Sequence, residues 1–208
     1  HPIYLERPNF TMNPEVLLSR IRIVLCRPSH PGNIGAAARA MKTMGLTDLH
    51  LVAPKCFPDQ EADTRATGAV DLLRRAKIND TLPEALAGTV LAVALSARRR
   101  DLGPPPGSPR EMASQLLAEA INGDVALVFG NESVGLSNEE IQHCHSAVTI
   151  PTNPGFSSLN LGAAVQVLCY ELRLAAYADA PQPEGSLVTA FSSPLATHDE
   201  VEGLYAHL

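Results

Sequence analysis

The segment FGNESVGLS, residues 129–137, joins a strand to a helix through a glycine-rich turn that carries one carboxylate. The preceding residues Val125–Phe129 are all apolar, which is typical of a buried strand. Ser137 and Glu140 have the spacing of a capping box, in which each side chain accepts the backbone N–H of the other, so a helix begins here. Glycines directly after a strand let a ligand approach the backbone closely. The turn therefore predicts a ligand site at the carboxyl end of a strand.

Short apolar segments alternate with helical patterns on both sides of this turn. Strands are predicted at residues 21–26, 49–52, 90–95, 125–129 and 147–150, and helices at 34–44, 69–76, 108–122 and 159–178, with a further helix starting at residue 81. This alternation is typical of a mostly parallel sheet with helices on both faces. The predicted fold class is therefore α/β.

Composition limits the possible functions. Of the 208 residues, 45% are hydrophobic, enough for one well-buried core, and no apolar run approaches the length of a membrane span. A net charge of −6 argues against a protein that coats nucleic acid indiscriminately, but it allows a local basic patch. Residues 98–100 are three arginines that directly follow the predicted strand at 90–95. Ligands bind at this edge of an open α/β sheet, so these arginines are candidates for a functional role.

Four scattered cysteines and the absence of a secretory pattern indicate reduced thiols in a cytoplasmic protein. The run His143-Cys144-His145 could suggest a metal ligand set. Adjacent residues on a helix point in different directions, however, and the sequence has no second cluster of ligands. No metal is predicted.

Composition also divides the chain. We expect residues 1–20 to form an N-terminal extension, in part foreign to the natural chain, since Met12 is a candidate natural start. Residues 21–178 are expected to form one domain. Residues 179–208, which begin with a stretch rich in Pro, Ser and Asp, are expected to form a linker and the start of a truncated, helical C-terminal extension.

The last long helix is predicted to be apolar on two sides. One stripe contains Leu161, Val165, Leu168 and Leu172, and the other contains Leu159, Val167, Tyr170, Leu174 and Tyr177. Such a helix must be covered on both sides. One side can pack on the sheet, and a second copy of the chain is expected to cover the other, which predicts a homodimer. A deeply buried position within a monomer is the alternative.

The glycine-rich turn has a first companion in residues 33–39. Asn33 follows a strand and is predicted to be the N-cap of a helix. Arg39 shares a face of that helix with the small residues Gly35 and Ala36 and with Lys42. Small residues beside an arginine leave room for a ligand, and these cations favour a phosphate or carboxylate.

The second companion is residues 157–160, which open the last helix. Ser157, Ser158 and Asn160 place two hydroxyls and an amide where backbone N–H groups are unpaired. Helix capping alone would also explain them. The sequence has no P-loop, no G-x-G-x-x-G after a strand and no G-x-S-x-G nucleophile elbow.

Together, N-x-x-x-x-x-R, F-G-x-E-x-x-G-L-S and S-S-L-N-L resemble the three signature motifs of the SPOUT class of RNA methyltransferases, over residues 21 to about 178. Within that class, segments 29–35, 40–46, 96–98 and 157–167 are most similar to the TrmJ family. Those enzymes methylate the ribose 2′-hydroxyl of nucleotide 32 in the tRNA anticodon loop.

The resemblance implies a C-terminal trefoil knot, S-adenosylmethionine as cofactor, tRNA as substrate, and a homodimer in which each site takes Arg39 from the other subunit. It also implies three sets of site residues. The cofactor set is Leu95, Ser96, Ala97, Gly130, Glu132, Gly135, Leu136, Ile150, Ser157, Ser158 and Leu159. The RNA-binding set is Asn33, Lys42, Arg98 and Arg100. The catalytic set is Arg39, Ser158 and Asn160.

A chemical role can be suggested for each catalytic residue. A guanidinium stays protonated in proteins, so we expect Arg39 to hold a phosphate and stabilise the developing alkoxide rather than act as a base. Ser158 and Asn160 would orient the hydroxyl. Glu132 is expected to brace the loops by accepting N–H bonds. Some relatives have Arg in place of Asn131, which removes one possible RNA contact here.

Two other functions stay open on the sequence alone. The chain could be a SPOUT 2′-O-methyltransferase that acts on ribosomal RNA or on another tRNA position. It could also be a knotted RNA-binding protein without turnover.

Overall fold

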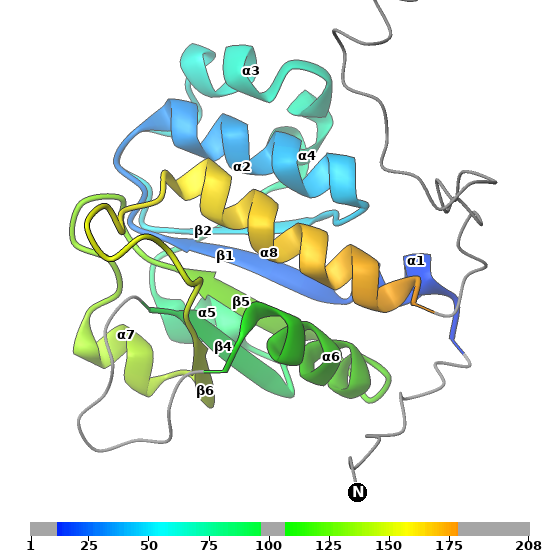
Figure 1. The fold of residues 1–208 in the computed structure, drawn as a ribbon. Coiled ribbons are helices and arrows are strands. Elements are labelled where there is room, and N and C mark those ends of the chain that lie inside the picture. Colours follow the sequence, from blue (N-terminus) through cyan, green and yellow to red (C-terminus); the bar gives the residue numbers. More distant parts are fainter. Residues whose placement is uncertain (1–11, 97–106, 179–208) are drawn as a thin grey trace, which may run out of the picture.

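A parallel six-stranded sheet forms the centre of the computed structural model, which describes residues 12–96 and 107–178 (Figure 1). The strands are β1 (Ile21–Cys26), β2 (Asp48–Val52), β3 (Lys77–Asn79), β4 (Leu91–Leu95), β5 (Val125–Phe129) and β6 (Ser146–Val148). Their order is β3-β2-β1-β5-β4-β6, and every pairing is parallel. The predicted α/β class is confirmed.

Helices cover both faces of this sheet. They are α1 (Pro14–Ser19), α2 (Pro31–Met44), α3 (Gln60–Ala66), the 3-10 helix η1 (Thr67–Ala69), α4 (Val70–Arg75), α5 (Leu82–Leu86), α6 (Pro109–Ala120), α7 (Asn138–Gln142) and α8 (Leu161–Ala176). Figure 1 shows α2 and α8 side by side on one face. None of the helices in the described parts of the chain has the length and apolar character needed to cross a membrane.

The core has two parts, one on each face of the sheet. In β1, Ile21, Ile23 and Leu25 point into the larger part, which α1, α2, α3, α4, α6 and α8 complete. Val24 and Cys26 point into the smaller part, which α5 and α7 cover. This alternation is the two-residue period of a strand buried on both faces.

Helix α1 was not predicted. Its Leu17 and Leu18 are buried in the larger core, at 0% and 1% exposure. The local signal is nevertheless present, because Asn13 accepts the Glu15 N–H at 2.8 Å and Pro14 occupies the first turn.

Several other boundaries differ from the prediction. Helix α2 begins at Pro31, with His30 at the N-cap position, so the predicted N-cap role of Asn33 is wrong. Proline fits the first helical position because its missing N–H would have no partner there. The short helix predicted at 69–76 is confirmed as α4, whereas α3, η1 and the edge strand β3 around it were not predicted. Helix α8 begins at Leu161 rather than at 159.

The small residues near Arg39 are used for helix packing. A Cβ on Gly35 would lie 2.2 Å from the carbonyl oxygen of Ala62 in α3, and a Cβ on Gly162 in α8 would lie 2.7 Å from the Cβ of Ala36. These positions bring α2 close to both of its neighbours. The expectation that they leave room for a ligand is therefore wrong.

We predict that Gly35→Ala destabilises the fold by about 1–3 kcal/mol, because the new methyl group must displace the backbone of α3. Gly68→Ala is the matched control, since a Cβ there meets no atom within 4 Å. Urea unfolding of the two variants measures the difference. Equal stabilities would contradict the close contact between α2 and α3.

Candidate active site

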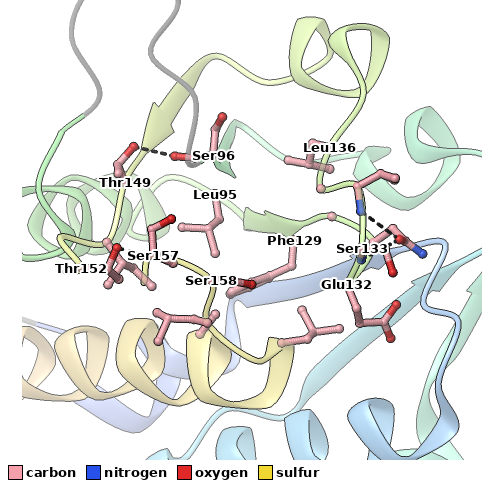
Figure 2. A pocket seen from close by; sticks show the side chains of 18 residues that line it. Leu95, Ser96, Phe129, Glu132, Ser133, Leu136, Thr149, Thr152, Ser157 and Ser158 are labelled. Carbon is pink, nitrogen blue, oxygen red and sulfur yellow. Dashed lines mark hydrogen bonds between the residues drawn. The ribbon is translucent and has the colours of Figure 1, made fainter. Parts of the chain in front are cut away.

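The turn at 130–136 and the segment 157–159 meet around a cavity of about 380 Å³ at the carboxyl ends of β4, β5 and β6 (Figure 2). This volume lies in the range of about 300–1,000 Å³ that is typical of small-molecule sites. The predicted cofactor residues that line it are Leu95, Ser96, Gly130, Glu132, Gly135, Leu136, Ile150, Ser157, Ser158 and Leu159. Ala97 lies outside the described residues.

Other lining residues were missed by the sequence analysis. Apolar walls come from Phe129 and Leu161, and hydroxyls come from Thr149 and Thr152. Thr149 lies near the carboxyl end of the strand predicted at 147–150, and this position was the available signal, since ligands bind where parallel strands end.

The glycine-rich turn leaves no space inside its own bend. A Cβ on Gly130 would lie 2.2 Å from both the Gly135 carbonyl carbon and the Leu136 nitrogen. The Gly135 N–H donates to the Asn131 carbonyl at 2.9 Å, and Gly135 has a φ of 69°, which favours glycine. Both glycines are therefore required for the turn to close on itself beside the cavity.

The carboxylate of Glu132 ties this turn to the segment before α2. It accepts the Ser29 N–H at 3.0 Å, the Ser29 hydroxyl at 2.8 Å and the His30 N–H at 3.2 Å. Burial alone would raise the pKa of Glu132, but hydrogen bonds from Ser29, from its own backbone and from Asn33 lower it to about 2. The expected bracing role is confirmed by these contacts.

Asn33 extends the connection to the third motif. Its Nδ2 donates to Glu132 Oε1 at 3.2 Å, and its Oδ1 accepts from Asn160 Nδ2 at 2.9 Å. Asn160 also caps α8, because its Oδ1 accepts the N–H groups of Gly162 and Ala163. A continuous path of hydrogen bonds thus links all three motifs.

The two serines of the third motif differ from Asn160. Ser157 and Ser158 are exposed, line the cavity and do not cap α8. Figure 2 shows them on the strip of chain that borders the cavity beside Leu95 and Phe129. Their hydroxyls are available to a bound molecule.

Asn131 has a structural use in this chain. Its Nδ2 donates to the Arg27 carbonyl at 2.8 Å, and its Oδ1 accepts the Ser133 N–H at 2.9 Å. It holds the turn in shape.

The predicted cationic residues lie apart from the cavity lining. Arg39 is exposed on α2, and no hydrogen bond or ion pair engages it within residues 12–96 and 107–178. Lys42 is exposed as well, pairs with Asp71 at 2.7 Å and donates to the Gly68 carbonyl. Arg98 and Arg100 lie outside the described residues.

The run His143-Cys144-His145 has separate local contacts. Cys144 is buried and its thiol donates to the Glu140 carbonyl, while His145 Nδ1 accepts the Ala92 N–H at 3.0 Å. No group of three or more potential metal ligands occurs among the residues that the structure describes.

Comparison with known proteins shows the family of the chain. The model of the SpoU rRNA Methylase family matches residues 20–170. The tRNA (cytidine/uridine-2′-O-)-methyltransferase TrmJ of Escherichia coli K12 is 52% identical over 92% of this chain and 77% of its own. The tRNA (cytidine/uridine/adenosine-2′-O-)-methyltransferase TrmJ of Pseudomonas aeruginosa is 50% identical, with the same shares covered.

A solved structure of a probable methyltransferase from Bordetella pertussis is 48% identical, with a TM-score of 0.73 over 78% of this chain and 99% of that one. The chain therefore belongs to the SpoU rRNA methylase family, and within it to the group of the TrmJ proteins.

We predict that Glu132→Gln lowers the free energy of unfolding at pH 7 by about 1–3 kcal/mol, because the amide places N–H groups against the donors of Ser29 and His30. The ordinary pKa of Glu132 is 4.5, and in the folded chain it is about 2. The stabilisation that ionised Glu132 gives the folded chain is complete above pH 4.5 and is lost as the pH falls to about 2. The difference between the variant and the wild type should therefore shrink in this interval.

Glu119→Gln is the control for this experiment. Glu119 is an exposed residue of α6 and does not line the cavity. Urea unfolding from pH 7 to pH 2 measures both variants. A Glu132→Gln deficit that stays constant with pH would contradict the ionised bracing role.

Proposed function

We propose that the chain is an S-adenosylmethionine-dependent tRNA methyltransferase, which methylates the ribose 2′-hydroxyl of cytidine or uridine at position 32 of the anticodon loop. The observation that carries this proposal is the convergence of two of the three motifs on one cavity, to which the third is tied by hydrogen bonds. The names of the TrmJ relatives, at 52% and 50% identity, support the reaction and the class of RNA.

The cavity fits the proposed cofactor. Leu95, Leu136 and Ile150 supply apolar walls for an adenine ring, and the tight bend at Gly130 brings backbone groups to the surface of the cavity. When bound, the cofactor supplies an activated methyl group on a sulfonium. The chain then has to hold one RNA hydroxyl next to that methyl group and keep other hydroxyls of the RNA away from it.

The catalytic roles follow from the exposed polar groups. Ser158 borders the cavity and would orient the ribose hydroxyl. Arg39 would bind the neighbouring phosphate and stabilise the negative charge that develops on the hydroxyl oxygen. Asn160 commits its amide to Asn33 and to the cap of α8, so it would act by fixing the position of the serines.

Cations outside the cavity would bind the tRNA backbone. Lys42 pairs with Asp71, but an exposed pair of this kind contributes little and can be exchanged for a phosphate. Arg98 and Arg100 are proposed for the same role. Asn33 has both amide atoms engaged, so its support of RNA binding would be indirect.

A homodimer completes the proposal. The inner stripe of α8 is buried, whereas Val167, Tyr170 and Leu174 of the outer stripe are 37%, 49% and 40% exposed. A second copy would cover this face and supply Arg39 to the site across the interface. We also propose the trefoil knot of the class, an end of the domain at residue 178, and action in the cytoplasm. The start of the domain was expected at residue 21 and is instead proposed before that residue, because Leu17 and Leu18 of α1 are buried in the core.

A methylation assay with labelled cofactor tests the proposed function. Purified chain should label a tRNA transcript, and replacing the ribose at position 32 by 2′-deoxyribose should abolish the label. Label that persists on the 2′-deoxy substrate would show that the chain methylates another nucleotide. Absence of label on any RNA, despite binding of the cofactor, would identify a binding protein without turnover.

We predict that Arg39→Lys lowers kcat about a hundredfold with little change in stability, because lysine keeps the charge but lacks the planar fork that grips a phosphate. Arg110→Lys is the control, since Arg110 pairs with Glu171 in the exposed part of the molecule. Steady-state methylation at saturating substrates and thermal unfolding measure the two properties. Near-normal turnover of Arg39→Lys would show that charge alone suffices.

We also predict that Tyr170→Glu combined with Leu174→Glu converts the dimer to a monomer, since two charges would be buried in an apolar interface. Ile121→Glu, at a residue 42% exposed at the end of α6, is the matched control. Sedimentation equilibrium reports the masses. A double variant that stays dimeric would assign the interface to another face.

A further inference from the structure

Arg27 directly follows β1 and is fixed by its neighbours on both sides. Its N–H donates to the Val52 carbonyl at the end of β2 at 2.7 Å, and its own carbonyl accepts from Asn131 at 2.8 Å. Its φ of 50° lies in the left-handed region, which turns the chain sharply at this point. Arg27 does not line the cavity.

The guanidinium of Arg27 binds the end of the glycine-rich turn, at Gly135, and Glu140 in α7. Its Nε and Nη2 donate to the two carboxylate oxygens of Glu140, each at 2.8 Å, and Nη2 also donates to the Gly135 carbonyl at 3.2 Å. This is the two-pronged geometry in which arginine binds a carboxylate most strongly. The Glu140 side chain is only 13% exposed, so solvent screens the pair less than at an open surface.

Glu140 is also hydrogen-bonded to Ser137, the N-cap residue of α7, so the contact with Arg27 restrains the start of this helix. Its carboxylate accepts the Ser137 N–H at 2.6 Å, and its own N–H donates to the Ser137 hydroxyl at 3.1 Å. Burial alone would raise the pKa of Glu140, but the hydrogen bonds from Arg27 and Ser137 hold it below its usual value. The carboxylate is therefore ionised when it meets the guanidinium.

The segment that Arg27 binds forms one wall of the cavity. Gly135 and Leu136 line the cavity, and Leu136 is nearly buried, at 7% exposure. Within the described part of the chain, Arg27 is the only residue outside 130–144 that makes a hydrogen bond to residues 135–140. Arg27 is therefore the hydrogen-bonding link between this wall and the end of β1.

We propose that Arg27 is a positioning residue for the methyl-donor site: by gripping Gly135 and Glu140, it fixes the wall of the cavity against which the donor binds. The proposal rests on the proposed function, because the ligand of the cavity is the cofactor of that reaction. Arg27 does not line the cavity, so it would act on the donor through this wall. Its effect is on the affinity of the site for the donor.

The experiment compares Arg27→Met and Arg27→Lys with the wild-type chain. S-adenosylhomocysteine is the probe, and its Kd is measured by isothermal titration calorimetry. Loss of a charge-assisted pair of hydrogen bonds should raise the Kd about tenfold in Arg27→Met. Lysine keeps the charge but cannot bond both Glu140 oxygens and Gly135, so Arg27→Lys should recover part of the affinity. KM for the methyl donor should rise in parallel, while KM for tRNA stays unchanged.

Arg20→Met is the matched control for a lost arginine. Arg20 caps the end of α6 by donating to the carbonyls of Ala120 and Ile121, and it does not line the cavity. It should lower the melting temperature and leave the Kd unchanged. Hydrogen exchange of peptides that cover residues 131–141 is the second readout, and it should be faster in Arg27→Met than in the wild type or in Arg20→Met.

The outcomes separate this proposal from the proposed function. A wild-type Kd and unchanged exchange in Arg27→Met would overturn the positioning role and leave the proposed function intact. A wild-type chain that binds no S-adenosylhomocysteine would overturn the proposed function and, with it, the role of Arg27 at a donor site. Equal loss of affinity in Arg20→Met would show a general effect of stability, which also contradicts the proposal.

Discussion

One partly buried carboxylate holds the candidate site together. Glu132 stands in the glycine-rich turn after β5, and its oxygens accept hydrogen bonds from Ser29, His30 and Asn33, about a hundred residues earlier in the chain. Asn33 in turn accepts a hydrogen bond from Asn160 at the start of α8. A charge removed in part from water needs such donors to remain ionised. The low pKa of Glu132 and the convergence of the motifs are therefore two consequences of the same contacts.

Close backbone packing is the second constraint. Gly130 allows the turn to fold back onto Gly135 and Leu136, and Gly162 allows the start of α8 to approach α2. A side chain at either position would push the third motif or the turn away from the sheet. Hydrogen bonds thus fix the loops around the cavity, and the glycines allow these loops to pack closely against their neighbours.

Much of the fold could be predicted from the sequence because the strands β1, β4 and β5 are short, apolar and followed by clear helix signals. The capping boxes at Thr81, Ser108 and Ser137 are all present in the structure. The two stripes of α8 were also predicted, since a periodic pattern over a long helix is a strong signal.

The missed features have weak local signals. Strand β3 is three residues long at the sheet edge, and its only large apolar side chain, Ile78, is 56% exposed, so no apolar run marks it. The N-cap of α2 was predicted at Asn33 because asparagine is a common capping residue. The helix instead begins at Pro31, because proline fits the first helical position. The role of Gly35 and Ala36 depends on α3 and α8, which are distant in sequence, so spacing alone suggested a ligand instead.

The same limit applies to the site. The resemblance to the SPOUT class predicted most of the residues that line the cavity, because its motifs occur in this chain. It could not reveal that Asn33 and Asn160 bond to each other, or that Arg27 reaches Gly135 and Glu140, since these contacts join segments that only the folded chain brings together.

A crystal structure of the chain with S-adenosylhomocysteine would test the central claim most directly. We expect the ligand between the turn at 130–136 and residues 157–159, with Glu132 still bonded to Ser29 and Asn33. Density for the ligand at another place on the molecule, with this cavity empty, would contradict it.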